Sequence, residues 1–170
     1  ESSTASSTTT CLLLGQLGSN LMAGRTWGIW TRGKLDVLRR YLDAFTTTTK
    51  NNATETIYID AFAGQPENRD RLTDEPIDGS AKIALSIDEP PFTILRFFET
   101  ERNAAALESV LLSDFPDRDL QVFGGDSNEL VPLELQRIRH LNWAPTFAFV
   151  DPNGMEAQWR TLEAIAGFKE

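Results

Sequence analysis

Residues 56–64 read TIYIDAFAG, a run of β-branched and aromatic side chains that ends in a carboxylate and a small, glycine-containing turn. A short run of this kind, bounded by turn residues, is typical of a buried strand. Similar apolar runs follow at 92–98 (FTILRFF), 120–123 (LQVF) and 146–150 (TFAFV). Apolar side chains that continue without alternation indicate strands covered on both faces of a sheet.

Segments with helical spacing separate these strands. Before the first strand, Thr31 is a candidate N-cap, and leucines recur at positions 35, 38 and 42 until the Thr-rich stretch 46–52 ends the pattern. Further helices are expected at 80–87, 103–112 and 126–140, and in the segment that contains Trp159, Leu162 and Ile165. Residues 65–79 are expected to form a polar loop. Strands that alternate with helices predict an α/β fold with a mostly parallel sheet and helices on both faces.

The composition excludes several classes of protein. The chain has 170 residues, with 16 Lys+Arg against 25 Asp+Glu, and its net charge is −9. The one cysteine excludes an internal disulfide framework, and the one histidine leaves no Cys/His cluster for a metal, so no metal is expected. No apolar run approaches the roughly 20 residues that span a bilayer. We therefore expect a soluble, cytoplasmic chain with no membrane partner.

The two ends of the chain differ from its centre. Residues 1–10 (ESSTASSTTT) contain no large apolar side chain. The part of the sequence with clear helix and strand patterns begins at Met22. Residues 1–21 are therefore expected to be a disordered or extraneous segment. Because the sequence stops directly after a helical pattern, residues 22–170 are expected to form one partial domain, truncated after the fourth strand and its following helix.

Each predicted strand delivers a carboxylate to its carboxyl end. These residues are Asp60, Glu99, Asp126 and Asp151. A single acid after a strand is normally a solvated turn or a helix cap. In a parallel sheet, however, all four carboxyl ends lie along the edge where α/β folds bind ligands. Four carboxylates at that edge favour a ligand with many hydrogen-bond donors or with positive charge.

S-adenosylmethionine has those properties, since it carries ribose hydroxyls, an adenine amino group, an ammonium and a sulfonium. It has no phosphate, so it needs no phosphate cradle at a helix N-terminus. A nicotinamide dinucleotide is disfavoured, because Gly64 is followed by Gln65, Pro66 and Glu67 rather than by a G-x-G-x-x-G pattern. Glu99 also lies 39 positions after Asp60 (99 − 60), against the roughly 20 expected for a dinucleotide's ribose acid. A nucleotide-binding oxidoreductase remains the less favoured alternative.

Several motifs carry a family resemblance. DAFAG, FFETERN, GGDSNE and FAFVDPNG, in this order, resemble motifs I to IV of class I S-adenosylmethionine-dependent methyltransferases. The chain from Trp30 onward more closely resembles the three-Cys-motif partner (TcmP) family, through WTRGKLDVLRRYL, YIDAFAG, DGSAKIAL, FFETERN and VDPNGMEAQWRTLEAIA. The resemblance implies a Rossmann-like class I methyltransferase sheet, and residues 22–170 would then be its partial cofactor-binding domain.

The resemblance also implies roles for individual residues. Asp60, Phe62 and Gly64 would line the methionine side of the S-adenosylmethionine pocket, Glu99 would hold the ribose and Asp126 the adenine, with Ala61 and Ser127 in the same cofactor-binding set. Asp151 and Pro152 would be catalytic, because their carboxylate and carbonyl would accept the amino hydrogens of the target. The family is similar to enzymes that methylate an adenine amino group in ribosomal RNA. Its name implies a three-Cys-motif protein partner, and the substrate would be a nucleic acid, RNA or DNA.

Two departures from the methyltransferase pattern leave an alternative open. Pro66 stands where such turns often have another glycine, and Asn153 stands where an aromatic residue would stack on a flipped base. The chain could therefore be a catalytically weak or inactive partner or binding module with the same fold. The basic residues Arg25, Arg32, Lys34, Arg39 and Arg40 are interpreted as a solvated helix face in preference to a phosphate-binding patch.

Overall fold

The computed structural model describes residues 11–14, 27–70, 73–152 and 154–168. Its centre is a parallel sheet in the order β6 (Leu120–Gly124), β5 (Ile94–Glu99), β2 (Ile57–Asp60) and β7 (Thr146–Val150). A short strand, β1 (Cys11–Leu14), pairs in parallel with the outer edge of β7. The α/β fold with a parallel sheet is therefore confirmed.

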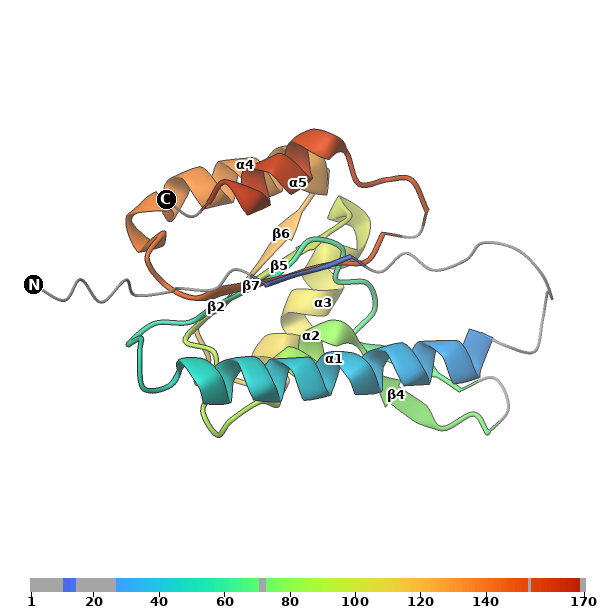
Figure 1. The fold of residues 1–170 in the computed structure, drawn as a ribbon. Coiled ribbons are helices and arrows are strands. Elements are labelled where there is room, and N and C mark those ends of the chain that lie inside the picture. The colour runs from blue at the N-terminus through green and yellow to red at the C-terminus, as the bar shows by residue number, and fades with distance from the viewer. Residues whose placement is uncertain (1–10, 15–26, 71–72, 153, 169–170) are drawn as a thin grey trace, which may run out of the picture.

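Helices cover both faces of this sheet (Figure 1). The first face carries α1 (Trp27–Thr49), α2 (Ser80–Leu85) and α3 (Glu101–Asp114), and the second carries α4 (Ser127–Arg137) and α5 (Trp159–Ala166). A single 3₁₀ turn, Arg139–Leu141, follows α4. None of the helices in the described ranges combines the length and apolar character needed to cross a bilayer.

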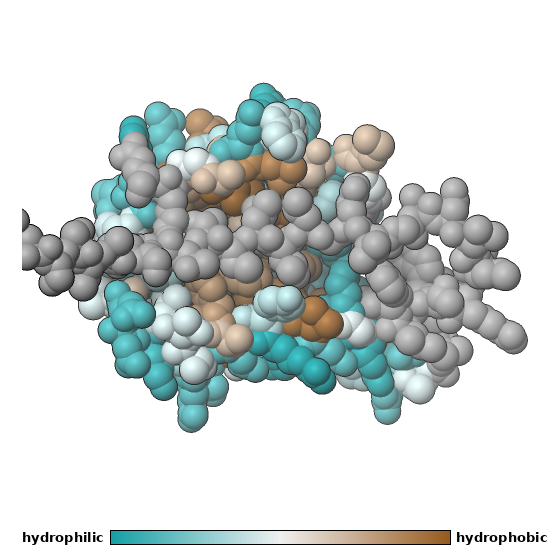
Figure 2. Space-filling model, in the orientation of Figure 1, coloured by the Kyte–Doolittle hydropathy of each residue, from teal (hydrophilic) through white to brown (hydrophobic). Residues whose placement is uncertain are grey.

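The strands are buried on both faces, as their continuous apolar runs predict. Tyr58, Phe97 and Phe147 pack on the first face against Leu38 and Leu42 of α1. Their rings form an aromatic cluster in which Tyr58 and Phe147 stack with centroids 6.1 Å apart. Figure 2 shows hydrophilic residues on the outer surfaces and hydrophobic ones between the layers. Because the two faces are filled, a ligand has access mainly at the sheet edges.

The second face has its own core, which is mainly aliphatic and also contains Phe98 and Phe168. Ile59, Ala148 and Val150 of the sheet are buried there against Val131 of α4 and Ile165 of α5. Neighbouring residues on a strand thus enter different cores, as the two-residue period of a strand requires.

Pairing in register brings the strand ends to one edge. Asp60, the last residue of β2, pairs with Phe97 of β5 and Phe149 of β7, while Glu99 at the end of β5 pairs with Gly124 of β6. The predicted alignment of the four carboxyl ends is therefore present.

Helix α1 is longer than the sequence pattern indicates. It begins at Trp27, so Thr31 lies inside the helix and is not its N-cap. It also runs through the Thr-rich stretch to Thr49, because the Thr48 and Thr49 hydroxyls donate to the backbone oxygens of Ala44 and Phe45. Hydroxyls that bond to the preceding turn of a helix satisfy themselves without ending it.

Three strands lie in segments where none was expected. The predicted polar loop 65–79 contains the antiparallel hairpin β3 (Glu67–Arg69) and β4 (Pro76–Asp78), whose mostly exposed polar residues have no apolar alternation to reveal them. Cys11–Leu14, inside the segment predicted to be disordered or extraneous, form β1 because their apolar run pairs with the free edge of β7. Residues 1–10 and 15–26 lie outside the described residues.

A buried ion network joins β5 to α4. Arg96 interrupts the apolar run of β5, and its Nε donates to Glu134 Oε1 at 3.1 Å while Nη1 donates to Asp119 Oδ1 at 2.9 Å. Arg137 Nε donates to Glu134 Oε2 at 2.6 Å. Glu134 is only 3% exposed. Because a buried charge is costly without its partner, this network requires α4 to lie against β5.

Replacing Glu134 with alanine is expected to lower the free energy of unfolding by about 3 kcal/mol, because Arg96 would lose its buried counter-charge. Urea denaturation followed by circular dichroism measures this change. The exposed Glu129 of the same helix is a matched control, and Glu129→Ala should change stability by less than about 0.5 kcal/mol. Equal effects of the two variants would contradict a role for the network in holding α4.

Candidate functional site

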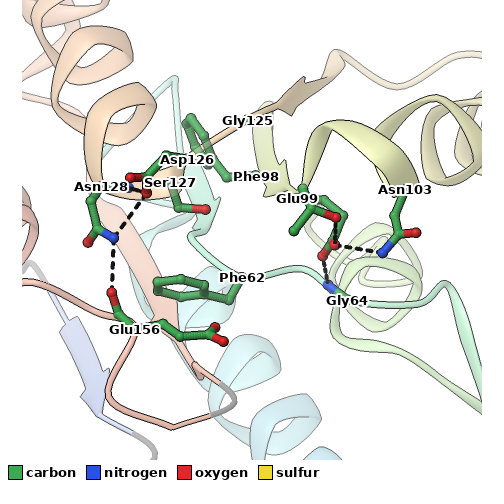
Figure 3. Close-up of a pocket in the computed structure, with 11 residues that line it drawn as sticks. Phe62, Gly64, Phe98, Glu99, Asn103, Gly125, Asp126, Ser127, Asn128 and Glu156 are labelled. Carbon is green, nitrogen blue, oxygen red and sulfur yellow. Dashed lines mark hydrogen bonds between the residues drawn. The ribbon is translucent and has the colours of Figure 1, made fainter.

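A pocket of about 390 Å³ opens at the carboxyl ends of β5 and β6 (Figure 3). Its walls come from the turn after β2, the β5–α3 and β6–α4 junctions, and the loop between β7 and α5. The lining residues are Phe62, Gly64, Phe98, Glu99, Thr100, Asn103, Gly125, Asp126, Ser127, Asn128 and Glu156. Five of the seven predicted cofactor-binding residues are among them.

Glu99 is held by neutral donors on three sides. Its Oε2 accepts the Gly64 amide at 2.8 Å, and Oε1 accepts the Thr100 hydroxyl at 2.9 Å and the Asn103 side-chain amide at 3.1 Å. Burial by itself raises the pKa of Glu99, but hydrogen bonds from Asn103, Thr100 and Gly64 outweigh burial, so the pKa is lowered. Glu99 therefore carries a negative charge at the pocket wall.

Asp126 caps α4 at the opposite wall. Its Oδ1 accepts the Asn128 backbone amide at 2.8 Å and the Asn128 side-chain amide at 3.0 Å, which confirms the predicted helix start. Gly125 precedes it with φ +147°, and a Cβ at Gly125 would lie 2.9 Å from Leu130 Cδ1. The glycine thus lets β6 turn sharply into α4 and places an exposed carboxylate beside the pocket.

Two phenylalanines supply the apolar part of the pocket. Phe98 is buried and stacks on Phe123, with ring centroids 4.8 Å apart. Phe62 is half-buried, and Figure 3 shows its ring on the side of the pocket that carries Ser127 and Glu156. A pocket with aromatic walls and a few directed polar groups is typical of a small-molecule site.

Asp60 and Ala61 are fully buried and are not among the residues that line the pocket. Asp60 accepts the Tyr58 hydroxyl at 3.2 Å and the Phe62 amide at 3.3 Å. It therefore shapes the turn that presents Phe62 and Gly64, whose φ of +65° favours glycine. Burial raises the pKa of Asp60 to about 7, even though hydrogen bonds from Ser80, Phe62 and Tyr58 oppose the shift.

Asp151 and Pro152 follow β7 and are not among the residues that line the pocket. Asp151 forms a partly buried ion pair with Lys34 of α1, a residue 117 positions earlier in the chain. This contact joins the opening helix to the end of β7, which no local sequence pattern indicates.

Three of the basic residues of α1 have partners elsewhere in the chain. Arg32 donates to Glu75 Oε2 at 3.3 Å, Arg39 donates to the Ser86 hydroxyl at 2.9 Å, and Lys34 pairs with Asp151. These contacts leave Arg40 as an exposed cation of the group. Arg25 and Asn153 lie outside the described residues. Arg32 and Arg40 are exposed, as expected for a solvated face, whereas Lys34 and Arg39 are partly buried by their contacts.

Sequence reasoning missed four polar residues of the pocket: Thr100, Asn103, Asn128 and Glu156. Asn103 lies four positions after Glu99 and Asn128 two after Asp126, so each follows a predicted carboxylate at the start of a helix. That spacing was an available signal, because the first turn of a helix faces the preceding strand end. Glu156 had no such signal, since it belongs to an irregular loop after β7.

Neither a metal-binding group among the described residues nor a similar known protein gives further information on the site. Among the described residues, no group of three or more His, Cys, Asp or Glu side chains is arranged to hold a metal ion. No protein-family model, curated protein or solved structure matches the chain. The geometry of the site and the sequence motifs are therefore the guides to function.

Asp60 is expected to make stability fall as the pH rises. Its pKa in the folded state is about 7 against an ordinary value of 3.8, so the folded chain holds a proton that the unfolded chain releases. The free energy of unfolding should decline by up to about 1.4 kcal/mol per pH unit between roughly pH 4 and pH 7 from this group. Urea titrations at several pH values measure the slope, and Asp60→Asn should remove it. A slope that persists unchanged in Asp60→Asn would show that other groups cause it.

Proposed function

We propose that this chain is an S-adenosylmethionine-dependent methyltransferase of the TcmP type, with a Rossmann-like class I sheet, and that it methylates an amino group on a nucleic-acid base. The observation that carries the proposal is the pocket, which is lined by Glu99 and Asp126 on opposite sides and by the ring of Phe62 (Figure 3). Both residues were predicted for the cofactor from their places after consecutive strands.

The pocket residues fit the chemistry of an adenosyl group. The ionised Glu99 is an acceptor suited to two ribose hydroxyls. Oδ1 of Asp126 takes both bonds from Asn128, so its other oxygen can accept an adenine amino group. Phe62 and Phe98 provide apolar surface for the base, and the volume of about 390 Å³ lies in the usual range for small-molecule sites.

The bound cofactor would supply an electrophilic methyl group on its sulfonium. The chain's own contribution is then mainly positioning of the acceptor. The Asp151 carboxylate and the Pro152 carbonyl would accept the two hydrogens of a target amino group, which would direct the nitrogen lone pair away from both acceptors. No metal is needed for this transfer.

A second candidate is a module that keeps the fold without efficient turnover and works with a three-Cys-motif protein. The observation that favours it is the Lys34–Asp151 ion pair, because the carboxylate proposed to receive the substrate already has a cationic partner. A substrate amino group would have to share or displace that contact. The two candidates differ in methyl transfer but agree on cofactor binding.

Replacing Glu99 with alanine is expected to weaken S-adenosylmethionine binding at least tenfold, because the ribose would lose a charged acceptor. Isothermal calorimetry on the purified chain measures the dissociation constant. Glu101→Ala is the control: this exposed acid two positions later does not line the pocket, and its loss should leave the affinity unchanged. Intact affinity in Glu99→Ala would contradict the cofactor assignment.

Replacing Asp151 with alanine is expected to reduce methyl transfer about a hundredfold with cofactor affinity retained, because only the acceptor would be misplaced. Transfer from S-adenosylmethionine with a labelled methyl group to bulk cellular RNA or DNA measures the rate. Asp117→Ala, an exposed acid before β6, is a control for the loss of one negative charge. Cofactor binding without any transfer by the unmodified chain would favour the partner module.

A further inference from the structure

A third carboxylate, Glu156, lines the pocket from the loop between β7 and α5. It is separated by 57 positions from Glu99 (156 − 99) and reaches the same cavity only through the fold. In Figure 3 its carboxylate lies near the ring of Phe62, whereas its backbone carbonyl faces Asn128. Glu156 therefore belongs to the pocket without belonging to any of the strand-end motifs.

Asn128 fixes this loop against the pocket. Its side-chain amide donates to the Glu156 carbonyl at 2.9 Å, and its Oδ1 accepts the Gln158 amide and the Thr161 hydroxyl, each at 2.8 Å. Asn128 is 6% exposed and Thr161 is fully buried. Because this bonded network is shielded from water, the backbone of Glu156 is held at a defined place beside the cavity.

The charges around the cavity are all of one sign. Glu99, Asp126 and Glu156 are acidic, and the other lining residues are neutral. Glu99 and Asp126 are held by amides and a hydroxyl, which are neutral donors and leave the negative charges uncompensated. Under the proposed function these two carboxylates serve the ribose and the base. The ribose and the base are neutral and are already matched by these two residues. Glu156 therefore adds a negative charge that neither of them needs.

We infer that Glu156 is a specificity-determining residue that makes the pocket prefer the cationic cofactor to its neutral product. This inference rests on the proposed function. S-adenosylmethionine carries one net positive charge at neutral pH, and S-adenosylhomocysteine, which remains after the methyl group leaves, carries none. A carboxylate at the cavity attracts the cationic S-adenosylmethionine and does not attract the neutral S-adenosylhomocysteine. It therefore favours exchange of product for fresh cofactor.

The size of the effect follows from the exposure of Glu156. Its side chain is in contact with solvent, so water and salt screen its field, and one such charge across a small cavity changes affinity only about threefold to fivefold. The effect should shrink at high ionic strength, whereas a purely steric contribution would not.

The test compares three ligands by calorimetry at low ionic strength: S-adenosylmethionine, S-adenosylhomocysteine, and sinefungin, a stable analogue with an amine in place of the sulfonium methyl group. Glu156→Gln should weaken the two cationic ligands about threefold and leave S-adenosylhomocysteine unchanged. Glu156→Lys should weaken the cationic ligands about tenfold, because the sign of the charge is reversed. In both variants the difference should diminish at high salt.

Glu129→Gln is the matched control, since it removes one exposed carboxylate outside the pocket lining and should leave all three affinities unchanged. Equal weakening of all three ligands in Glu156→Gln, or no weakening of any, would overturn the inference and leave the proposed function intact. Failure of every ligand to bind the unmodified chain would overturn both.

Discussion

The hydrogen bond from the Gly64 amide to Glu99 is the contact on which the site depends. It spans 2.8 Å between the turn after β2 and the end of β5, two strands that are adjacent in the sheet. The bond holds Gly64 at φ +65° and fixes one oxygen of Glu99. The other oxygen is fixed by Thr100 and Asn103 at the start of α3. One carboxylate thus connects the turn, the strand end and the helix that together form a wall of the pocket.

Burial on both faces of the sheet explains why the pocket lies at the carboxyl ends of the strands. Tyr58 and Ile59 enter different cores on successive residues, so the only polar positions on β2 lie at its end. Asp60, which lies at that end, is fully buried, and burial raises its pKa to about 7. Its bonds to the Tyr58 hydroxyl and the Phe62 amide hold the turn in shape. The fold therefore accepts a destabilising group in order to present Phe62 and Gly64.

The sequence patterns predicted those features that depend on residues close together in the chain. The apolar runs identified the four central strands, and the carboxylates after them identified Glu99 and Asp126, because strand direction and helix capping depend on near neighbours. The Lys34–Asp151 pair and the position of Glu156 were missed, since each requires segments remote in sequence to meet. The hairpin β3–β4 was missed for another reason: its mostly exposed residues carry no apolar alternation.

The strand-end carboxylates differ in whether their hydrogen-bond partners are neutral or positively charged, and this difference affects how they attract ligands. Glu99 and Asp126 accept hydrogen bonds from neutral groups, which orient a carboxylate and stabilise its charge without cancelling the field beyond it. Asp151 is paired with the Lys34 ammonium, which does cancel much of its field at a distance. The carboxyl ends of the strands thus form a pocket that keeps the negative charges of Glu99 and Asp126. The neighbouring position, Asp151, is neutralised by Lys34. Under the proposed function, the cationic cofactor would be drawn to the first, whereas an uncharged amino group at the second would share Asp151 with Lys34.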